Sequence, residues 1–419
     1  MVIMEGKGRL DGVDLRELVS TVPTPFYAYS ASAIRHRVGA LQTALGGMNA
    51  RICYAVKANG NLAVLRLMAG LGIGADIVSA GEMHRALHAG IPAGNIVFSG
   101  VGKTADEMAQ ALAAGVWRFN IESRDELHTL QTVAAEQDVV ALAAVRINPD
   151  VDAGTHAKIS TGKAENKFGV TMDEARDWFS QSDAFPNVRL DGLHVHIGSQ
   201  ILTLQPFRLA MQQVAAFAAQ LAASGHPINS IDVGGGLGVR YRHGHDVPVC
   251  VNEYAAMLRA TFADFDGTIV LEPGRYLVAE AGVLITRVVR IKAGASREFL
   301  VVDAAMNDLQ RPALYDAWHE IIPLHDRGGG DVRYDVVGPV CETGDTFAVQ
   351  RSMPRCQAGD LLLIANAGAY GASMSSNYNS RPLTAELMLD RGRHAVVRRR
   401  QSFEEMVAGE SLAAEWLTA

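Results

Sequence analysis

The stretch Arg51-Ile-Cys-Tyr-Ala-Val-Lys-Ala-Asn59 runs from an apolar, strand-like segment into a lysine and an asparagine. Such a continuous apolar run is typical of a parallel strand that helices cover on both faces. Similar segments recur as far as residue 278, and most are separated by helical patterns. We expect eight strands, at residues 52–56, 74–78, 96–99, 117–121, 139–147, 190–197, 230–233 and 268–272. This alternation predicts an α/β fold built on a (β/α)8 barrel of the TIM type.

The helix before the seventh strand has the clearest boundary. Residues 205–225 carry apolar side chains at helical spacing, and Gly225 stands where a C-terminal cap would fall. We expect this helix to cover the outside of the barrel.

After the eighth strand the sequence becomes mainly strand-like. Short apolar segments separated by turn residues lie at 283–292, 299–303, 332–337, 346–350 and 360–364. The extended segment Thr21-Val-Pro-Thr-Pro-Phe-Tyr-Ala-Tyr29 could join their sheet. We therefore expect the barrel at residues 30–280 and a β-rich domain formed by residues 1–29 and 281–419.

Composition excludes several classes of partner. The 419-residue chain is 48% hydrophobic, has a formal charge of −7 and contains no large basic cluster, which argues against nucleic acid as its main partner. The four cysteines are far apart and lack metal-binding spacing. No signal-peptide core or membrane-length apolar run is visible. We expect a reduced, cytoplasmic protein without a membrane span.

The candidate reacting group is Lys57, at the end of the first barrel strand. Active sites of such barrels lie at the C-terminal ends of the strands. A lysine is costly to bury unless it is paired or covalently engaged, so Lys57 is either a surface residue at a strand end or a Schiff-base lysine. The second interpretation requires a carbonyl partner and a lowered pKa.

A phosphate site is predicted across the barrel. Asp232-Val-Gly-Gly-Gly-Leu-Gly238 follows the seventh strand, where phosphate-binding loops recur in this fold. Glycines let backbone N–H groups approach an anion closely, although a glycine triplet by itself is only a turn signal.

The sixth and eighth strands end in further reactive groups. In Glu272-Pro-Gly-Arg275, the two charged side chains could pair, or they could hold a ring nitrogen and an anionic group of a heterocyclic cofactor. Alternation sends His194 and His196 to one face of their strand. Zinc would need a third ligand that the sequence does not reveal, so we expect no metal and favour an imidazole stacked on a ring. With Lys57 and the phosphate loop, these groups indicate pyridoxal 5′-phosphate.

The motifs around these residues resemble those of the fold type III pyridoxal-phosphate decarboxylases, which share a barrel with the alanine racemases. Further motifs narrow the resemblance to the diaminopimelate decarboxylase family, with threonine at position 343 where the family often has serine. They are Lys158-Ile-Ser-Thr-Gly162, Asn166-Lys-Phe-Gly169, Arg311-Pro-Ala-Leu-Tyr315, Cys341-Glu-Thr-Gly-Asp345 and Gly368-Ala-Tyr-Gly371. The resemblance implies decarboxylation of meso-diaminopimelate to L-lysine and CO2, the last step of lysine biosynthesis.

The resemblance also implies a role for each cofactor-binding residue. Lys57 would hold the cofactor covalently, Asp76 would lie near both, His196 would stack on the ring, and Glu272 would face its nitrogen. The residues expected around the phosphate and this strand end are Ser199, Gly234, Gly235, Gly236, Pro273, Gly274, Arg275 and Tyr370.

For the substrate, the resemblance implies that Cys341 donates a proton to the α carbon. Cys341 could otherwise be a small buried residue. The expected contacts to the distal amino acid group are Arg275, Arg311, Tyr315 and Glu342, and Tyr370 is expected to bind the substrate as well. Arg311 could otherwise be an ordinary solvated arginine.

In this family the loop with Cys341 and Glu342 enters the neighbouring subunit, which implies a homodimer with shared active sites and dimer contacts from the β-rich domain. Alternatives are a related decarboxylase acting on carboxynorspermidine, ornithine or arginine, a racemase with a tyrosine base in place of Cys341, and a non-catalytic cofactor-binding regulator. Strong discrimination against plain lysine or ornithine is expected, because these would leave buried arginines unpaired.

Overall fold

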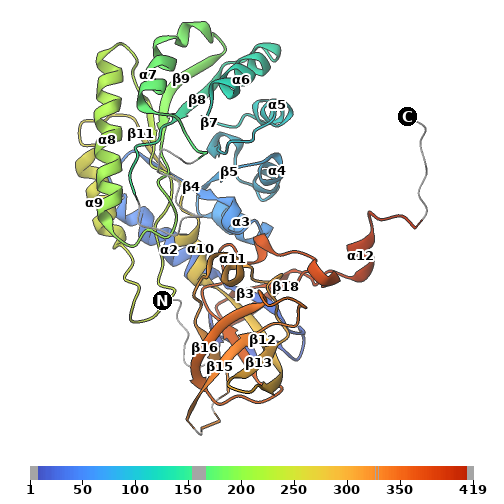
Figure 1. Ribbon diagram of the computed structural model, residues 1–419. Coiled ribbons are helices and arrows are strands. Elements are labelled where there is room, and N and C mark those ends of the chain that lie inside the picture. Colours follow the sequence, from blue (N-terminus) through green and yellow to red (C-terminus); the bar gives the residue numbers. More distant parts are fainter. Residues whose placement is uncertain (1–7, 153–166, 326, 329, 413–419) are drawn as a thin grey trace. The chain divides into compact units, whose positions relative to one another are not determined.

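The computed structural model describes residues 8–412 except 153–166, 326 and 329 (Figure 1). The motif at 158–162 and Asn166 therefore lie outside the described residues. Contacts divide the chain into two units, each described by itself. Among the described residues, the barrel unit contains Ala31–Ala281 and Gly368–Ser373. The β unit contains residues 8–30, Gly282–Ala367 and residues 374–412.

Eight parallel strands close the barrel in the order β10-β11-β4-β5-β6-β7-β8-β9. Strands β5, β6 and β7 are buried at every residue, as expected of strands covered on both faces. The predicted (β/α)8 barrel is confirmed, with small shifts at strand ends. The strands are β4 (Ala50–Ala55), β5 (Gly74–Ile77), β6 (Ile96–Phe98), β7 (Arg118–Ile121), β8 (Ala141–Arg146), β9 (Val188–His194), β10 (Ser230–Asp232) and β11 (Thr268–Leu271).

The helices of the barrel unit begin and end at recognisable caps. The Thr104 side chain and Glu107 form a capping box at the start of α5, and the predicted helix α8 ends at cap residue Ser224, followed by Gly225 with a φ of +90°. The helices are α2 (Ala31–Ala44), α3 (Leu62–Gly70), α4 (Ala80–His88), α5 (Ala105–Ala114), α6 (Arg124–Glu136), α7 (Met172–Ser180), α8 (Leu204–Ala223), α9 (Val251–Thr261) and α10 (Arg275–Val278), with 3-10 helices η1 (Val56–Ala58), η2 (Ala93–Asn95), η4 (Ser182–Ala184) and η5 (Ala279–Ala281).

The β unit contains a nine-stranded sheet with the main order β16-β15-β13-β12-β3-β18-β19, while β17 pairs with β12 and β14. Its strands are β3 (Phe26–Ser30), β12 (Gly282–Ala293), β13 (Glu298–Val302), β14 (Ile321–Pro323), β15 (Asp331–Val337), β16 (Thr346–Pro354), β17 (Leu361–Ile364), β18 (Ala385–Asp390) and β19 (Arg393–Arg398). The unit also has the small pair β1 (Arg9–Leu10) and β2 (Val13–Asp14), and helices α1 (Leu15–Leu18), α11 (Arg311–Tyr315) and α12 (Phe403–Val407). A second, mainly β architecture is thus confirmed, although β14, β18 and β19 were not predicted.

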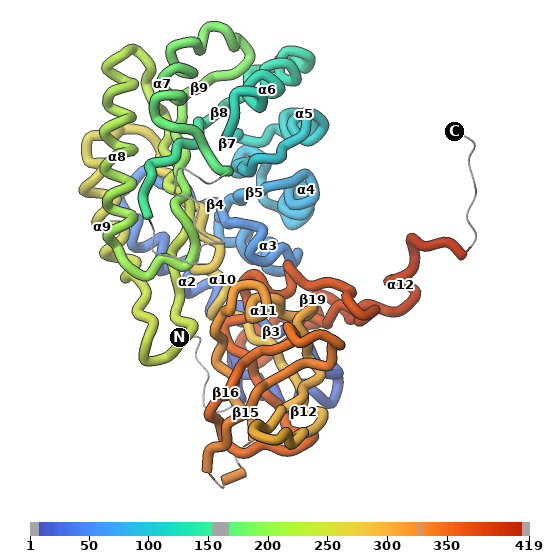
Figure 2. Tube along the Cα trace, viewed as in Figure 1, coloured from blue at the N-terminus to red at the C-terminus, as the bar shows by residue number. Residues whose placement is uncertain are grey.

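The N-terminal strand β3 lies inside this sheet. It runs antiparallel to β12, with Tyr29 opposite Gly282, and parallel to β18, with Ala28 opposite Leu387. In Figure 2 its blue trace lies among the orange strands that come from the other end of the chain. The prediction that the N-terminal segment joins the second sheet is confirmed.

Across the described part of the chain, no helix has both the length and the apolar character needed to cross a bilayer. The four cysteines are free thiols, of which Cys53 and Cys356 are buried while Cys250 and Cys341 are exposed.

Candidate active site

Lys57 lies on the 3-10 helix η1, directly after strand β4. Its ammonium group forms an ion pair with Asp76, a fully buried side chain on β5, while the Lys57 side chain is 39% exposed. Although burial opposes the charge, Asp76 and Glu272 raise the pKa of Lys57 above its ordinary value. The lowered pKa expected from the sequence is therefore not found, because the neighbouring carboxylates outweigh desolvation.

Glu272 directly follows strand β11, and its carboxylate is held by groups from three other strand ends. Oε1 accepts hydrogen bonds from Oγ of Ser99 at 3.1 Å and from Nδ2 of Asn120 at 3.3 Å. Oε2 lies 3.3 Å from Nε2 of His194. Burial would raise the pKa of Glu272, but His194 and Lys57 bring it below its ordinary value. Glu272 is therefore an anion.

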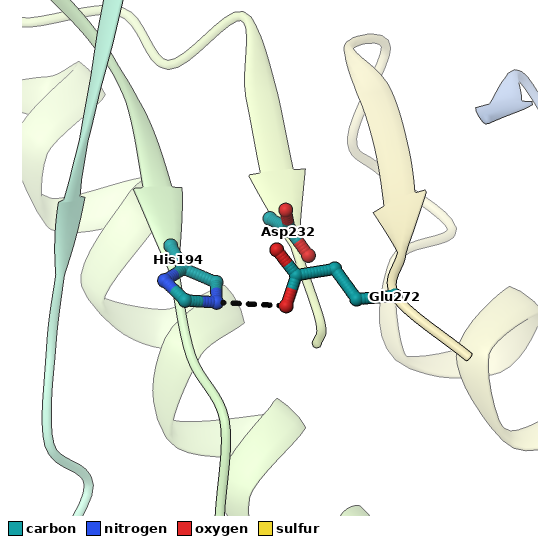
Figure 3. Close-up of side chains that lie close together, drawn as sticks. All are labelled: His194, Asp232 and Glu272. Carbon is teal, nitrogen blue, oxygen red and sulfur yellow. Dashed lines mark ion pairs between the residues drawn. The ribbon is translucent and has the colours of Figure 1, made fainter. Parts of the chain in front are cut away.

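Asp232, at the end of β10, completes this buried cluster. Figure 3 shows His194 and Asp232 beside the Glu272 carboxylate, and the ligand-type atoms of the three residues lie within 4.8 Å of one another. Burial and the negative charge of Glu272 raise the pKa of Asp232 well above its ordinary value. Metal ions also use such residues, but here Asp232 already accepts the Gly234 N–H at 2.9 Å, and Glu272 accepts the two donors described above. We interpret the cluster as a hydrogen-bonded one.

His196 lies against the glycine loop that follows β10. Its Nδ1 accepts the N–H of Gly235 at 3.1 Å. Burial, followed by the positive charge of Arg146, lowers the pKa of His196 to about 3, so the imidazole is neutral near neutral pH. Gly234 has a φ of +67°, and a Cβ there would lie 2.4 Å from the carbonyl oxygen of Val195. The loop can approach His196 this closely only because residue 234 is glycine.

Arg275, the first residue of α10, binds hydroxyl groups. Its Nη2 and Nε donate to Oγ of Ser199 at 2.9 and 3.3 Å, and its Nη1 donates to the hydroxyl of Tyr241 at 2.7 Å. Its Cζ lies 4.9 Å from the ring centre of Tyr370. Arg275 thus turns toward the side expected to hold a phosphate rather than toward Glu272. Tyr241 was not identified from the sequence.

The backbone around these groups is closely packed. The N–H of Tyr370 donates to the carbonyl of Ala58 at 2.7 Å, and the carbonyl of Pro273 accepts the N–H of Ala55 at 3.3 Å. A Cβ on Gly274 would lie 3.0 Å from Cβ of Ala58 and 3.3 Å from the Tyr370 hydroxyl. The segment Gly368–Ser373 is therefore part of the barrel site, although it follows most of the β-unit strands in sequence.

In the β unit, Arg311 and Tyr315 stand at the two ends of the short helix α11. Arg311 is only 6% exposed, and its Nη1 lies 2.8 Å from Nε2 of His319. The solvated arginine considered from the sequence is therefore excluded. His319 was missed by the sequence analysis because its link to Arg311 depends on how the chain turns after α11.

Cys341 and Glu342 lie together on an exposed loop of the β unit. The backbone N–H of Cys341 is 3.4 Å from Oδ1 of Asn379, and the Glu342 carboxylate accepts the hydroxyl of Tyr378 at 2.9 Å. Cys341 is exposed, so it is not a small buried core residue.

The barrel-unit side chains fit a pyridoxal-type cofactor by their chemistry. An amine, a buried carboxylate anion, a neutral imidazole, and a guanidinium with a hydroxyl partner stand at the strand ends. In addition, Oδ1 of the buried Asp76 has no hydrogen-bond partner among the described residues, so it can still accept one. The residues that the sequence analysis missed here are Ser99, Asn120, Asp232, Tyr241 and the role of His194. Polar residues at barrel strand ends were the available signal for most of them.

Comparison with known proteins agrees with this chemistry. A family model described as the pyridoxal binding domain of pyridoxal-dependent decarboxylases matches residues 31–279. A diaminopimelate decarboxylase of Zymomonas mobilis is 46% identical over 411 residues, which cover 97% of each chain. The solved diaminopimelate decarboxylase of Helicobacter pylori, complexed with L-lysine, matches with a TM-score of 0.91 at 44% identity over 94% of this chain and 98% of that one. That of M. jannaschii, also complexed with L-lysine, has a TM-score of 0.93 at 34% identity over 98% and 97% of the two chains.

Proposed function

This chain belongs to the diaminopimelate decarboxylase family of pyridoxal-phosphate carboxy-lyases, and we propose a role for each of its active-site residues. Enzymes of this family convert meso-diaminopimelate to L-lysine and CO2 in lysine biosynthesis. The similarity runs nearly end to end with a curated relative and with solved structures. The proposed roles rest on one observation: Lys57, Asp76, His196 and Glu272 lie at the C-terminal mouth of the same barrel.

Each barrel residue would hold one part of the cofactor. Lys57 would bind it covalently through Nζ, and Asp76 would balance charge beside that amine. His196 would lie against the ring as a neutral imidazole, and Glu272 would face the ring nitrogen. When bound, the cofactor supplies a protonated pyridine ring that takes up the negative charge left at the α carbon as CO2 departs.

The other end of the cofactor would bind where the structure gathers anion-binding groups. The guanidinium of Arg275, the hydroxyls of Ser199 and Tyr370, and the backbone of Gly234–Gly236 would surround the phosphate, with Pro273 and Gly274 shaping the adjacent backbone. The support is the Arg275–Ser199 hydrogen bonding and the closely packed glycines.

Arg275, Arg311 and Tyr315 would bind the distal carboxylate of diaminopimelate, and Glu342 would bind its distal ammonium. Tyr370 would also contact the substrate. Cys341 would donate a proton from Sγ to the α carbon after CO2 has left. The complexes of two solved relatives with L-lysine support an amino acid ligand for this site.

We also propose a homodimer in which each active site takes Cys341 and Glu342 from the partner. The support is the family resemblance and the exposed loop that carries both residues, which suits a contact with another molecule. A location in the cytoplasm stays a prediction from the sequence.

The test is the formation of L-lysine and CO2 from meso-diaminopimelate by purified protein with pyridoxal phosphate, with L-lysine, L-ornithine and L-arginine as competing substrates. Equal amounts of lysine and CO2 from diaminopimelate alone are expected. Faster decarboxylation of ornithine or arginine, in protein that binds the cofactor, would instead favour a related decarboxylase with another distal pocket.

A further inference from the structure

The Glu272 carboxylate is held by side chains to which the proposed function assigns no role. Ser99 and Asn120 donate to one oxygen and His194 lies 3.3 Å from the other. Carboxylate oxygens of Asp232 and Glu272 also lie within 4.8 Å of each other. Asp232 is 1% exposed and Glu272 is 6% exposed. Two carboxyl groups therefore meet where water cannot separate them (Figure 3).

A hydrogen bond between two carboxyl groups requires a proton on one of them, because two carboxylate anions are both acceptors. Two like charges at this separation in a buried site also raise one pKa strongly, so that one group stays neutral. The closeness of two buried carboxyl groups thus favours one proton on the pair, but it does not say which residue carries that proton.

The neighbours decide which carboxyl group carries the proton. Glu272 receives two hydrogen bonds from Ser99 and Asn120, and His194 and Lys57 lower its pKa, so it is the better anion. Asp232 receives the Gly234 N–H at 2.9 Å and shares the Asn120 amide, whose Nδ2 lies 3.4 Å from its Oδ2, but no hydroxyl or imidazole contacts it as Ser99 and His194 contact Glu272 among the described residues. Burial and the Glu272 charge raise the pKa of Asp232 well above its ordinary value. The other ionisable groups that interact with Asp232 or Glu272 are Cys53, Asp76, Arg118, His196 and Tyr254.

We propose that Asp232 is a positioning residue that stays protonated, donates a hydrogen bond to Glu272, and so holds Glu272 as an anion oriented toward the ring nitrogen of the cofactor. This inference rests on the proposed role of Glu272. Asp232 acts through Glu272 alone and need not touch the cofactor. The protonated Asp232 side chain is neutral, so it acts through its donor hydrogen and its shape rather than through a charge.

If Asp232 acts as a neutral hydrogen-bond donor, two substitutions should give different results. Asp232→Asn keeps a neutral donor of nearly the same shape and should recover most of the activity that Asp232→Ala loses. Asp232→Ala removes the donor and should lower kcat by about tenfold to a hundredfold, the effect of a displaced catalytic group. In Asp232→Ala, the 15N resonance of labelled pyridoxal phosphate should shift toward the unprotonated ring, whereas Asp232→Asn should keep the wild-type resonance.

The proton itself can be observed without activity. Infrared difference spectra of cofactor-free wild type against Asp232→Asn should contain a protonated carboxyl band at neutral pH that belongs to Asp232. Absence of that band, or an Asp232→Asn variant whose ring resonance resembles that of Asp232→Ala, would overturn the inference.

The test remains decisive if Asp232→Ala fails to fold, because the infrared band and the Asp232→Asn resonance do not depend on it. It also separates two kinds of failure. A wild type that binds pyridoxal phosphate but forms no lysine from diaminopimelate would contradict the proposed function. An active wild type without the Asp232 band would contradict only the inference.

Discussion

Arg311 and His319 are direct partners in the β unit: Nη1 of Arg311 lies 2.8 Å from Nε2 of His319, and Nδ1 of His319 lies 2.8 Å from the carbonyl oxygen of Ala365. A guanidinium can only donate, so Nε2 is the acceptor and the imidazole hydrogen is on Nδ1, where it donates to Ala365. His319 is therefore neutral, and it fixes the direction of the Arg311 side chain. It is 1% exposed, so water cannot replace it easily.

Substitution of His319 by phenylalanine should weaken substrate binding. Arg311 would lose the His319 acceptor, and the arginine proposed to bind the distal carboxylate would be less well oriented. We expect KM for diaminopimelate to rise about tenfold, equivalent to about 1.4 kcal/mol of binding, with a smaller change in kcat. His319→Gln, which can offer an acceptor oxygen near the position of Nε2, is the matched control and should lie closer to wild type. A loss confined to kcat would show that Arg311 does not act on the substrate in this way.

Removal of the Asp76 charge should change the reactivity of Lys57. The pKa of Lys57 is raised because Asp76 and Glu272 favour the ammonium form, so the neutral amine is scarce below that pKa. Asp76→Asn should therefore lower the pKa and move the reaction of Lys57 with a carbonyl reagent to lower pH. The measurement is the pH dependence of that reaction in cofactor-free protein, with Lys57→Ala as the blank. An unchanged profile would mean that Asp76 does not control the charge of this amine.

His196 should remain neutral throughout the working range of the enzyme. Its pKa is lowered to about 3, first by burial and then by the charge of Arg146. Its imidazole NMR resonances should thus show no titration between about pH 5 and 9, the range in which an ordinary histidine gains its proton. A midpoint near that of a free histidine would rule out a buried neutral ring at position 196.

Two inactive variants should restore activity together if active sites are shared. Lys57→Ala and Cys341→Ala each remove one essential group, but a mixed dimer would retain one site with both groups intact. Under subunit exchange we expect about a quarter of wild-type activity, because about half of the dimers are mixed and each has one intact site of two. Exchange is verified with differently tagged subunits. Mixed dimers without activity would mean that each site is built from a single chain.

The barrel could be predicted because its strands are continuous apolar runs, a local signal that each segment carries by itself. Strands β18 and β19 lacked such a signal. Strand β19 is an edge strand whose residues are half-buried or exposed. Strand β18 pairs with β3, which lies more than 300 positions away in the chain. The hydrogen bond from Tyr29 to Glu386, for example, joins residues 357 positions apart. Local patterns do not reveal such distant pairing.

In the active site, too, the residues with a local sequence signal could be predicted, whereas their partners in space could not. Lys57, His196, Glu272 and the glycine loop could be identified because each follows a barrel strand. Their partners depend on which strands become neighbours around the barrel: Asp232 meets Glu272 because β10 lies beside β11. The raised pKa of Lys57 likewise follows from Asp76 on the adjacent strand β5, and no spacing in the sequence shows the balance between that charge and burial.

The position of β3 has a consequence for biosynthesis on the ribosome. This strand precedes the barrel strands in the chain, yet both of its neighbours, β12 and β18, are translated only after all eight barrel strands. Until β12 and β18 have been translated, β3 has unpaired backbone edges and exposed apolar residues, unless a chaperone shields them. The eight barrel strands can thus pair before β18 is translated, whereas the sheet of the β unit can be completed only afterwards.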